Sequence, residues 1–263
     1  LLREQGRWLE KVSYRPMNLL QSIRDAQKPL LAVLIDPGKT KAAEWEKVIQ
    51  NEYSPDYYFV GGSEAGSEEC HACVCFLKEH QSRPVILFPG NENQICELAD
   101  VILLLSLISG RNADLLIGQH VRAAERLNQS SLEIIPTAYV LIDNGFGSSV
   151  QRVSQTEPIP AEDIRLCVRT ALAGQQLGLQ LLYLEAGSGA PRPVPAKLIA
   201  EVKKYLRIPL IVGGGIDSVE KCKEAIEAGA GLIVIGNALE KNPKMLDDIA
   251  PLFENETARK EGN

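Results

Sequence analysis

Residues 209–237 of the chain read PLIVGGGIDSVEKCKEAIEAGAGLIVIGN and hold its clearest fold signal. Two apolar runs, at 209–212 and 232–235, are short and rich in β-branched residues, as strands buried on both faces are. Between them, residues 219–228 have the three- and four-residue apolar spacing of an amphipathic helix. Ser218 is placed to cap the start of this helix, and Gly229 follows its end. The stretch therefore predicts a strand, a helix and a second strand.

The same alternation continues along the rest of the chain. Eight apolar runs predict strands, at 30–35, 57–60, 84–88, 101–105, 133–142, 180–184, 209–212 and 232–235. Helical spacing follows them at 41–49, 68–79, 91–98, 111–128, 161–177, 195–206, 219–228 and 239–253. Eight such units predict an α/β protein, a (β/α)₈ TIM-type barrel. A doubly wound open sheet is the alternative, and eight strands would be many for it.

One barrel accounts for most of the 263 residues, since α/β barrels routinely use 200–250. We expect the catalytic barrel domain at 30–253, an N-terminal helical extension at 1–29 and a frayed, charged tail at 254–263. In the extension, residues 18–21 resemble a capping box that opens a short helix at the barrel bottom. The connection at 143–160 is rich in Gly, Ser and Pro, and we expect it to act as a lid or binding loop.

The composition is that of an ordinary globular protein, with 45% hydrophobic residues, 24% charged residues and a net charge of -6. This acidic balance argues against a nucleic-acid binder. The N-terminal residues lack the apolar core of a signal peptide, and the most apolar run, 101–108, is far shorter than the ~20 residues that span a bilayer. Six cysteines in apolar or helical contexts indicate reduced thiols. We therefore expect a cytoplasmic protein with at most peripheral membrane contact.

Two glycine-rich turns, GGG at 213–215 and GN at 236–237, follow the last two predicted strands. Active sites of such barrels lie at the C-terminal ends of the strands, often with a phosphate held after the last two. Glycine lets the backbone approach a ligand closely, and each turn leads into a helix whose N-terminus favours an anion. The pair therefore predicts a phosphate site, with plain tight turns as the alternative.

Two acids also stand at predicted strand ends. Asp36 suits Mg²⁺, which takes one or two carboxylates plus substrate phosphates, although an Asp-Pro turn is the alternative. A carboxylate at the end of an apolar strand is costly unless it is paired or used, so Glu185 is a candidate general base or acceptor for a substrate hydroxyl. Cys70, Cys73 and Cys75 lack a second pair at zinc spacing, which favours buried thiols over a metal site.

Several motifs together resemble one family. YLEAGSGA at 183–190 is the specific one, whereas VGGGI at 212–216 and IGNA at 235–238 are shared by many phosphate-binding barrels. IDPGK at 35–39, VGGS at 60–63 and AYVLID at 138–143 occur in the matching order. From about residue 30 to 242, the chain resembles the geranylgeranylglyceryl phosphate synthase family. One branch of that family carries a lysine two residues before the aspartate, and Leu34 places this chain nearer the other branch.

The resemblance implies an Mg²⁺-dependent prenyltransferase. It would join sn-glycerol 1-phosphate to geranylgeranyl diphosphate, a prenyl diphosphate, giving the ether lipid geranylgeranylglyceryl phosphate and pyrophosphate. A homo-oligomer is expected as well. By similarity, Asp36 and Ser63 would hold the metal. Glycerol phosphate would be bound by Tyr183, Leu184, Glu185, Ala186, Gly187, Ser188, Gly189, Gly213, Gly214, Gly215, Gly236 and Asn237.

Elementary chemistry agrees with this reaction. Breaking the allylic carbon–oxygen bond puts negative charge on the leaving pyrophosphate, which Mg²⁺ neutralises. The glycerol hydroxyl must lose its proton, a task suited to Glu185 as the catalytic residue. We also expect a long apolar groove across the barrel top, and Lys39 is a candidate to supply the charge missing at Leu34. A sugar-phosphate isomerase or lyase of the same fold, and a non-catalytic phospho-ligand binder, are the alternatives.

Overall fold

Eight parallel strands close into a barrel in the computed structural model, which describes residues 18–143, 145 and 147–254. In chain order they are β1 (Leu30–Ile35), β2 (Tyr57–Val60), β3 (Val85–Leu87), β4 (Val101–Leu107), β5 (Glu133–Asp143), β7 (Leu181–Glu185), β8 (Leu210–Gly213) and β9 (Leu232–Ile235). The ring closes where β1 pairs with β9, and a two-residue strand, β6 (Ile159–Pro160), pairs only with β5. The predicted TIM-type barrel is confirmed.

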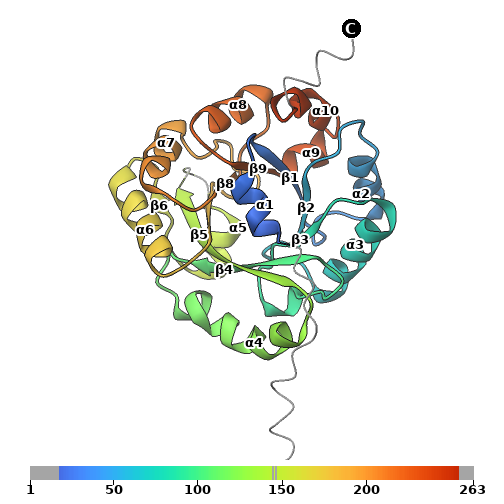
Figure 1. Ribbon diagram of the computed structural model, residues 1–263, viewed down its shortest axis with the longest axis horizontal. Coiled ribbons are helices and arrows are strands. Elements are labelled where there is room, and N and C mark those ends of the chain that lie inside the picture. The colour runs from blue at the N-terminus through green and yellow to red at the C-terminus, as the bar shows by residue number, and fades with distance from the viewer. Residues whose placement is uncertain (1–17, 144, 146, 255–263) are drawn as a thin grey trace, which may run out of the picture.

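Helices cover the outside of this ring (Figure 1). They are α2 (Ala42–Ile49), α3 (Ser67–His80), α4 (Gln119–Gln129), α6 (Ile164–Gln176), α7 (Ala196–Tyr205), α8 (Val219–Glu227), α9 (Asn237–Lys241) and α10 (Met245–Ile249). A short helix, α5 (Ser149–Ser154), lies in the connection after β5. Within the described residues, none of the helices is long and apolar enough to cross a membrane.

Two predicted helices differ from the structure. The segment 239–253 breaks into α9, α10 and a 3₁₀ turn, because Pro243 cannot continue a helix and forces Asn242 out of helical geometry. The segment 91–98 keeps only a 3₁₀ turn, Glu92–Gln94. Its Gln94 side chain is buried and donates to the carbonyls of Gly62 and Ala65, both at 2.8 Å. This segment therefore holds the loop after β2 in place instead of forming a helix.

The barrel interior is closed at one end by α1 (Leu19–Asp25), which crosses the middle of the ring in Figure 1. Leu19 and Ile23 pack into the inner core together with inward side chains of the strands. The helix was expected, but its capping box is wrong, because Asn18 is left-handed and makes no side-chain cap. Instead the buried Glu133 carboxylate accepts the N–H groups of Leu19 at 2.7 Å and Leu20 at 3.0 Å. The extension before residue 18 and the tail after 254 lie outside the described residues.

Candidate active site

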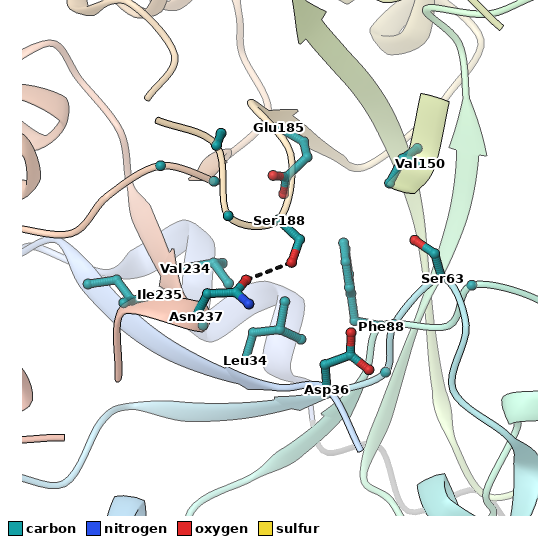
Figure 2. A pocket seen from close by; sticks show the side chains of 18 of the residues that line it. Leu34, Asp36, Ser63, Phe88, Val150, Glu185, Ser188, Val234, Ile235 and Asn237 are labelled. Atoms are coloured by element: carbon teal, nitrogen blue, oxygen red, sulfur yellow. Dashed lines mark hydrogen bonds between the residues drawn. The ribbon is translucent and has the colours of Figure 1, made fainter. Parts of the chain in front are cut away.

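A cavity of about 480 Å³ lies at the opposite end of the barrel, where the strands end (Figure 2). Most of the sequence-predicted site residues meet there. Those that line the cavity are Asp36, Ser63, Tyr183, Glu185, Ser188, Gly189, Gly214, Gly215, Gly236 and Asn237. They come from the ends of five different strands, so the closure of the barrel brings them together.

Four predicted residues do not line this cavity. Leu184 and Ala186 are buried in the layer between barrel and helices, because successive side chains of a strand point to opposite faces. Gly213 accepts a hydrogen bond from the Ala186 N–H at 3.0 Å, and the Gly187 N–H donates to Glu185 Oε1 at 2.5 Å. These four positions hold the lining residues in place and do not face the cavity.

The glycines after β8 leave room for two functional side chains. A Cβ at Gly213 would lie 2.2 Å from Tyr183 Oη, and a Cβ at Gly214 would lie 2.2 Å from Glu185 Oε1. Gly214 also has φ +81°, a conformation that other residues adopt at a cost. Close approach to β7, as well as backbone shape, therefore requires glycine here.

Glu185 is the most strongly perturbed acid of the site. It is 5% exposed, and burial raises the pKa of its carboxyl to about 7, although the Gly187 N–H, the Tyr183 hydroxyl and the Lys39 charge each lower it. Burial, then the Glu185 charge, also raises the pKa of Tyr183 well above its usual value, so this hydroxyl stays protonated. Tyr183 Oη is close to the carboxylate but lacks the geometry of a hydrogen bond, and no other described group pairs with it. Glu185 can therefore exchange a proton near neutral pH, beside an unpaired hydroxyl.

An apolar wall continues from Tyr183 into the rest of the cavity. The ring of Phe88 lies 5.1 Å from that of Tyr183 and 5.8 Å from that of Tyr139, between centroids. Further apolar lining comes from β1, β4, the turn before α4, and α5, with Leu34, Leu105, Leu107, Leu115, Val150 and Val153. Sequence reasoning predicted a groove but named none of these residues. The alternation of inward and outward side chains along each strand could have identified the strand-borne ones.

Asp36 lies on the other side of the cavity, near the loop that carries Ser63 (Figure 2). Its Oδ1 accepts from the Gly38 N–H at 3.1 Å, and its Oδ2 is paired with Lys39 Nζ at 3.0 Å. A Cβ at Gly62 would lie 2.3 Å from Asp36 Oδ1, so the loop before Ser63 passes directly over the carboxylate. The Asp-Pro turn also forms, since the Asp36 carbonyl accepts the N–H groups of Lys39 and Thr40 at 3.0 Å.

This pair of side chains fits a magnesium ion in its donor chemistry. A carboxylate and a hydroxyl are both hard oxygen donors, and they face one cavity. Among the described residues, no group of three or more His, Cys, Asp or Glu side chains could hold a metal by itself. A magnesium ion at Asp36 and Ser63 would therefore need further oxygens from a substrate.

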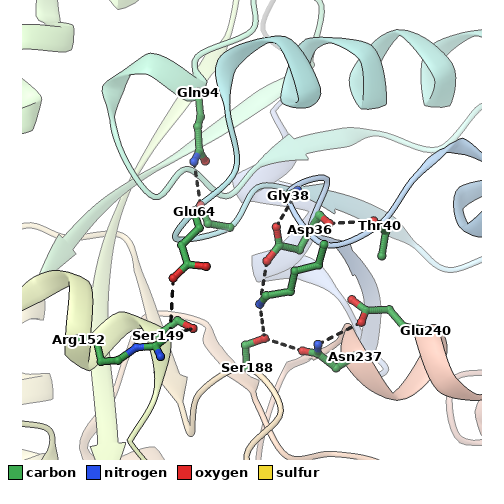
Figure 3. Close-up of polar contacts among 12 residues, drawn as sticks. Asp36, Gly38, Thr40, Glu64, Gln94, Ser149, Arg152, Ser188, Asn237 and Glu240 are labelled. Atoms are coloured by element: carbon green, nitrogen blue, oxygen red, sulfur yellow. Dashed lines mark hydrogen bonds and ion pairs between the residues drawn. The ribbon is translucent and has the colours of Figure 1, made fainter.

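A chain of polar contacts crosses the cavity mouth (Figure 3). Lys39 Nζ donates to Ser188 Oγ at 3.1 Å, and Ser188 Oγ donates to Asn237 Oδ1 at 2.6 Å. Asn237 Nδ2 in turn donates to Glu240 Oε2 at 3.2 Å. The ion pair of Asp36 with Lys39 joins this chain at its other end. Loops after β1, β7 and β9 are thus linked directly, which the sequence did not reveal.

The connection after β5 borders the same mouth. Val150, Val153 and Ser154 of α5 line the cavity, and Arg152 forms an ion pair with Glu64 at 3.5 Å (Figure 3). The connection therefore lies at the cavity, and its action as a lid or binding loop stays a prediction. The ion pair joins it to the loop that carries the predicted metal ligand Ser63.

Comparison with known proteins supports the resemblance in sequence. Residues 24–252 match the PcrB family. The chain is 47% identical to the geranylgeranylglyceryl phosphate synthase of Spirosoma linguale, over 89% of this chain and 95% of that protein. It is 54% identical to the enzyme of the same name from Zunongwangia profunda, over 81% of this chain and 92% of that protein.

Solved structures agree. Wild-type GGGPS from Thermoplasma volcanium matches with a TM-score of 0.84 and 33% identity, covering 90% of this chain and 98% of that one. The geranylgeranylglyceryl phosphate synthase of Thermoplasma acidophilum, in complex with its substrate sn-glycerol-1-phosphate, matches with a TM-score of 0.83 and 32% identity, covering 92% and 99%. An N-acetylmannosamine-6-phosphate 2-epimerase from Clostridium perfringens, at 14% identity and a TM-score of 0.53, shares the fold alone. The chain therefore belongs to the PcrB family and is similar to geranylgeranylglyceryl phosphate synthases along its whole barrel.

Proposed function

We propose that the protein transfers the geranylgeranyl group of geranylgeranyl diphosphate to sn-glycerol 1-phosphate, forming an ether lipid precursor. The observation that carries this proposal is Glu185, a buried carboxyl with a pKa of about 7. It lies between glycine-rich turns on one side and an apolar wall on the other. A polar phosphate ester and an apolar chain can therefore meet at one base.

Glycerol phosphate is assigned to the side of the cavity formed by Ser188, Gly214, Gly215, Gly236 and Asn237. Three of these residues are glycines, which expose their backbone to the cavity, and the other two carry polar side chains. The related structure from Thermoplasma acidophilum binds this substrate. Fold and sequence similarity over 92% of this chain support the same ligand here.

The reaction then requires one proton transfer and one exchange of bonds. Glu185 accepts the proton of the glycerol hydroxyl, and that oxygen forms a bond to the first carbon of the prenyl chain. The allylic carbon–oxygen bond breaks, and its electron pair leaves with the pyrophosphate. Burial helps Glu185 because a carboxyl with a pKa near the working pH is a good proton acceptor and donor.

Asp36 and Ser63 would hold Mg²⁺ on the diphosphate side of the cavity. When bound there, the ion would neutralise negative charge on the leaving group. The described residues that line the cavity carry four carboxylates, on Asp36, Glu185, Asp217 and Glu240, and two ammonium groups, on Lys39 and Lys241. An anionic diphosphate therefore needs an added cation to enter this cavity.

The prenyl chain is assigned to the apolar wall. Phe88 and Tyr139 lie next to Tyr183, and Leu105, Leu107 and Leu115 add further apolar lining to the same cavity. Burial of each CH₂ group against such a wall contributes about 0.8 kcal/mol. This assignment agrees with the groove expected across the barrel top.

Three broader expectations remain part of the proposal. The protein acts in the cytoplasm, which its six free cysteines support. It forms a homo-oligomer, which sedimentation analysis of the purified protein would test. Residues 30–253 form the catalytic domain, with the helical extension at 1–29 and the tail at 254–263.

The decisive experiment incubates the protein with labelled sn-glycerol 1-phosphate and prenyl diphosphates of several chain lengths, with and without Mg²⁺. We expect a label that becomes extractable into organic solvent only when all three are present. Absence of any lipid-soluble product would contradict the proposal. Turnover of a phosphorylated sugar in the same cavity would instead favour an isomerase or lyase.

A further inference from the structure

We propose that Lys39 couples the two substrate sites: its ammonium binds the phosphate of the glycerol substrate, and its departure from Asp36 frees that carboxylate for the divalent cation. The inference rests on the proposed function and gives one side chain two alternating partners. Lys39 is then a positioning residue for the metal as well as a ligand of the phosphate.

Lys39 forms an ion pair with Asp36. Lys39 Nζ lies 3.0 Å from Asp36 Oδ2, while Asp36 Oδ1 already accepts the Gly38 N–H. Both carboxylate oxygens therefore already have a partner within the protein. A divalent cation at Asp36 Oδ2 would lie close to the Lys39 ammonium, and the repulsion between the two positive charges favours departure of the ammonium.

The other partner of Lys39, Ser188, belongs to the phosphate side of the cavity. Lys39 Nζ donates to Ser188 Oγ at 3.1 Å, and Ser188 contacts Asn237. Ser188 and Asn237 border the space assigned to the glycerol phosphate. The Lys39 side chain is 35% exposed. A small rotation about its four-carbon stem therefore brings the ammonium within reach of an anion placed there.

The charge of the cavity favours the same movement of Lys39. Carboxylates outnumber ammonium groups among the described lining residues, and Leu34 adds an apolar side chain from β1. Of the two lining lysines, Lys241 is exposed at the end of α9, and Lys39 is the one in contact with both Asp36 and Ser188. A doubly charged phosphate therefore draws Lys39 more strongly than the single negative charge of Asp36 does.

This exchange has a thermodynamic consequence. If glycerol phosphate removes Lys39 from Asp36, it must raise the affinity for the divalent cation, and the cation must raise the affinity for glycerol phosphate by the same factor. Without Lys39, the cation binds more tightly when alone, because its competitor is gone. Glycerol phosphate then binds more weakly when alone, because it has lost a ligand.

The test compares the wild-type protein with Lys39→Met, and with Lys241→Met as a control that removes the same charge from the rim. Mn²⁺ binding is followed by electron paramagnetic resonance, and binding of sn-glycerol 1-phosphate by calorimetry, each alone and with the other present. Thermal melting checks that each variant is folded. No turnover is needed for any of these measurements.

For Lys39→Met we expect Mn²⁺ alone to bind roughly two- to fivefold more tightly. We expect the affinity for glycerol phosphate alone to fall by roughly tenfold or more. Its enhancement of Mn²⁺ binding should shrink, whereas Lys241→Met should keep the wild-type enhancement. The inference is overturned if Lys39→Met weakens both ligands, changes neither, or behaves like Lys241→Met. A wild-type protein that binds no glycerol phosphate would instead contradict the proposed function itself.

Discussion

Replacing Glu185 by glutamine should remove the proton acceptor and make the protein more stable above neutral pH. The side chain is 5% exposed, and burial raises the pKa of its carboxyl from 4.5 to about 7. The glutamine amide in Glu185→Gln would keep the shape and can still accept the Gly187 N–H, but it carries no charge to bury. Turnover should therefore fall to a small fraction of the wild-type rate while phosphate binding is retained.

The size of the stability effect follows from the change in pKa. Below about pH 4.5 the carboxyl is protonated in both folded and unfolded chains, so it causes no difference. Between pH 4.5 and 7 the carboxyl is ionised in the unfolded chain but still protonated in the folded protein. The wild-type protein therefore loses stability as the pH rises through this range. Each pKa unit corresponds to 1.36 kcal/mol, so the loss amounts to about 3 kcal/mol above pH 7.

The assay is urea unfolding of wild type and Glu185→Gln at several pH values from 5 to 8.5. The variant should gain on the wild type as the pH rises, by about 3 kcal/mol in total, or on the order of 5–10 °C in melting temperature. Glu224→Gln, on the exposed face of α8, provides the control, with no such trend. A difference between Glu185→Gln and wild type that stays constant with pH would refute a raised pKa at this position.

Three further changes test other parts of the structure. Asp36→Asn should lower product formation roughly hundredfold or more and should weaken Mn²⁺ binding, while glycerol phosphate still binds. Unchanged Mn²⁺ binding would exclude Asp36 as a ligand. Gly214→Ala puts a Cβ 2.2 Å from Glu185 Oε1, so calorimetry should show no glycerol phosphate binding and melting should show a loss of about 1–3 kcal/mol. Glu133→Ala removes the acceptor for the Leu19 N–H at the barrel floor, and should cost about 2 kcal/mol in urea unfolding with an unchanged KM.

Most of the fold follows from local sequence patterns, because each barrel strand is a short, continuous apolar run. The run at 30–35 and the run at 232–235 coincide with β1 and β9 to the residue. Patterns failed where a distant contact decided the outcome. Gln94 is held by carbonyls of the β2 loop, and the cap of α1 comes from Glu133, more than a hundred residues away. A local sequence motif cannot predict partners that lie so far away along the chain.

The candidate site shows the same division. Position at a strand end was enough to single out Asp36 and Glu185, since all strand ends of a barrel meet on one face. Leu184 and Ala186 were predicted as site residues only because they belong to the YLEAGSGA motif. Their side chains point away from the cavity, as the alternation along a strand requires. Lys39 remained ambiguous, because its two partners belong to different loops and its role depends on their separation.

The cap of α1 also bears on where the barrel begins. A boundary at residue 30 separates Glu133 from the N–H groups that it accepts, although all strands lie on one side of that boundary. Cut there, the chain would lose both N–H donors of the Glu133 carboxylate and the Leu19 and Ile23 side chains that pack into the inner core. β5 runs from that carboxylate to Asp143, where the connection with α5 begins. The strand therefore carries the cap of α1 at one end and the connection at the other, and the helix before residue 30 belongs to the structural core of the enzyme.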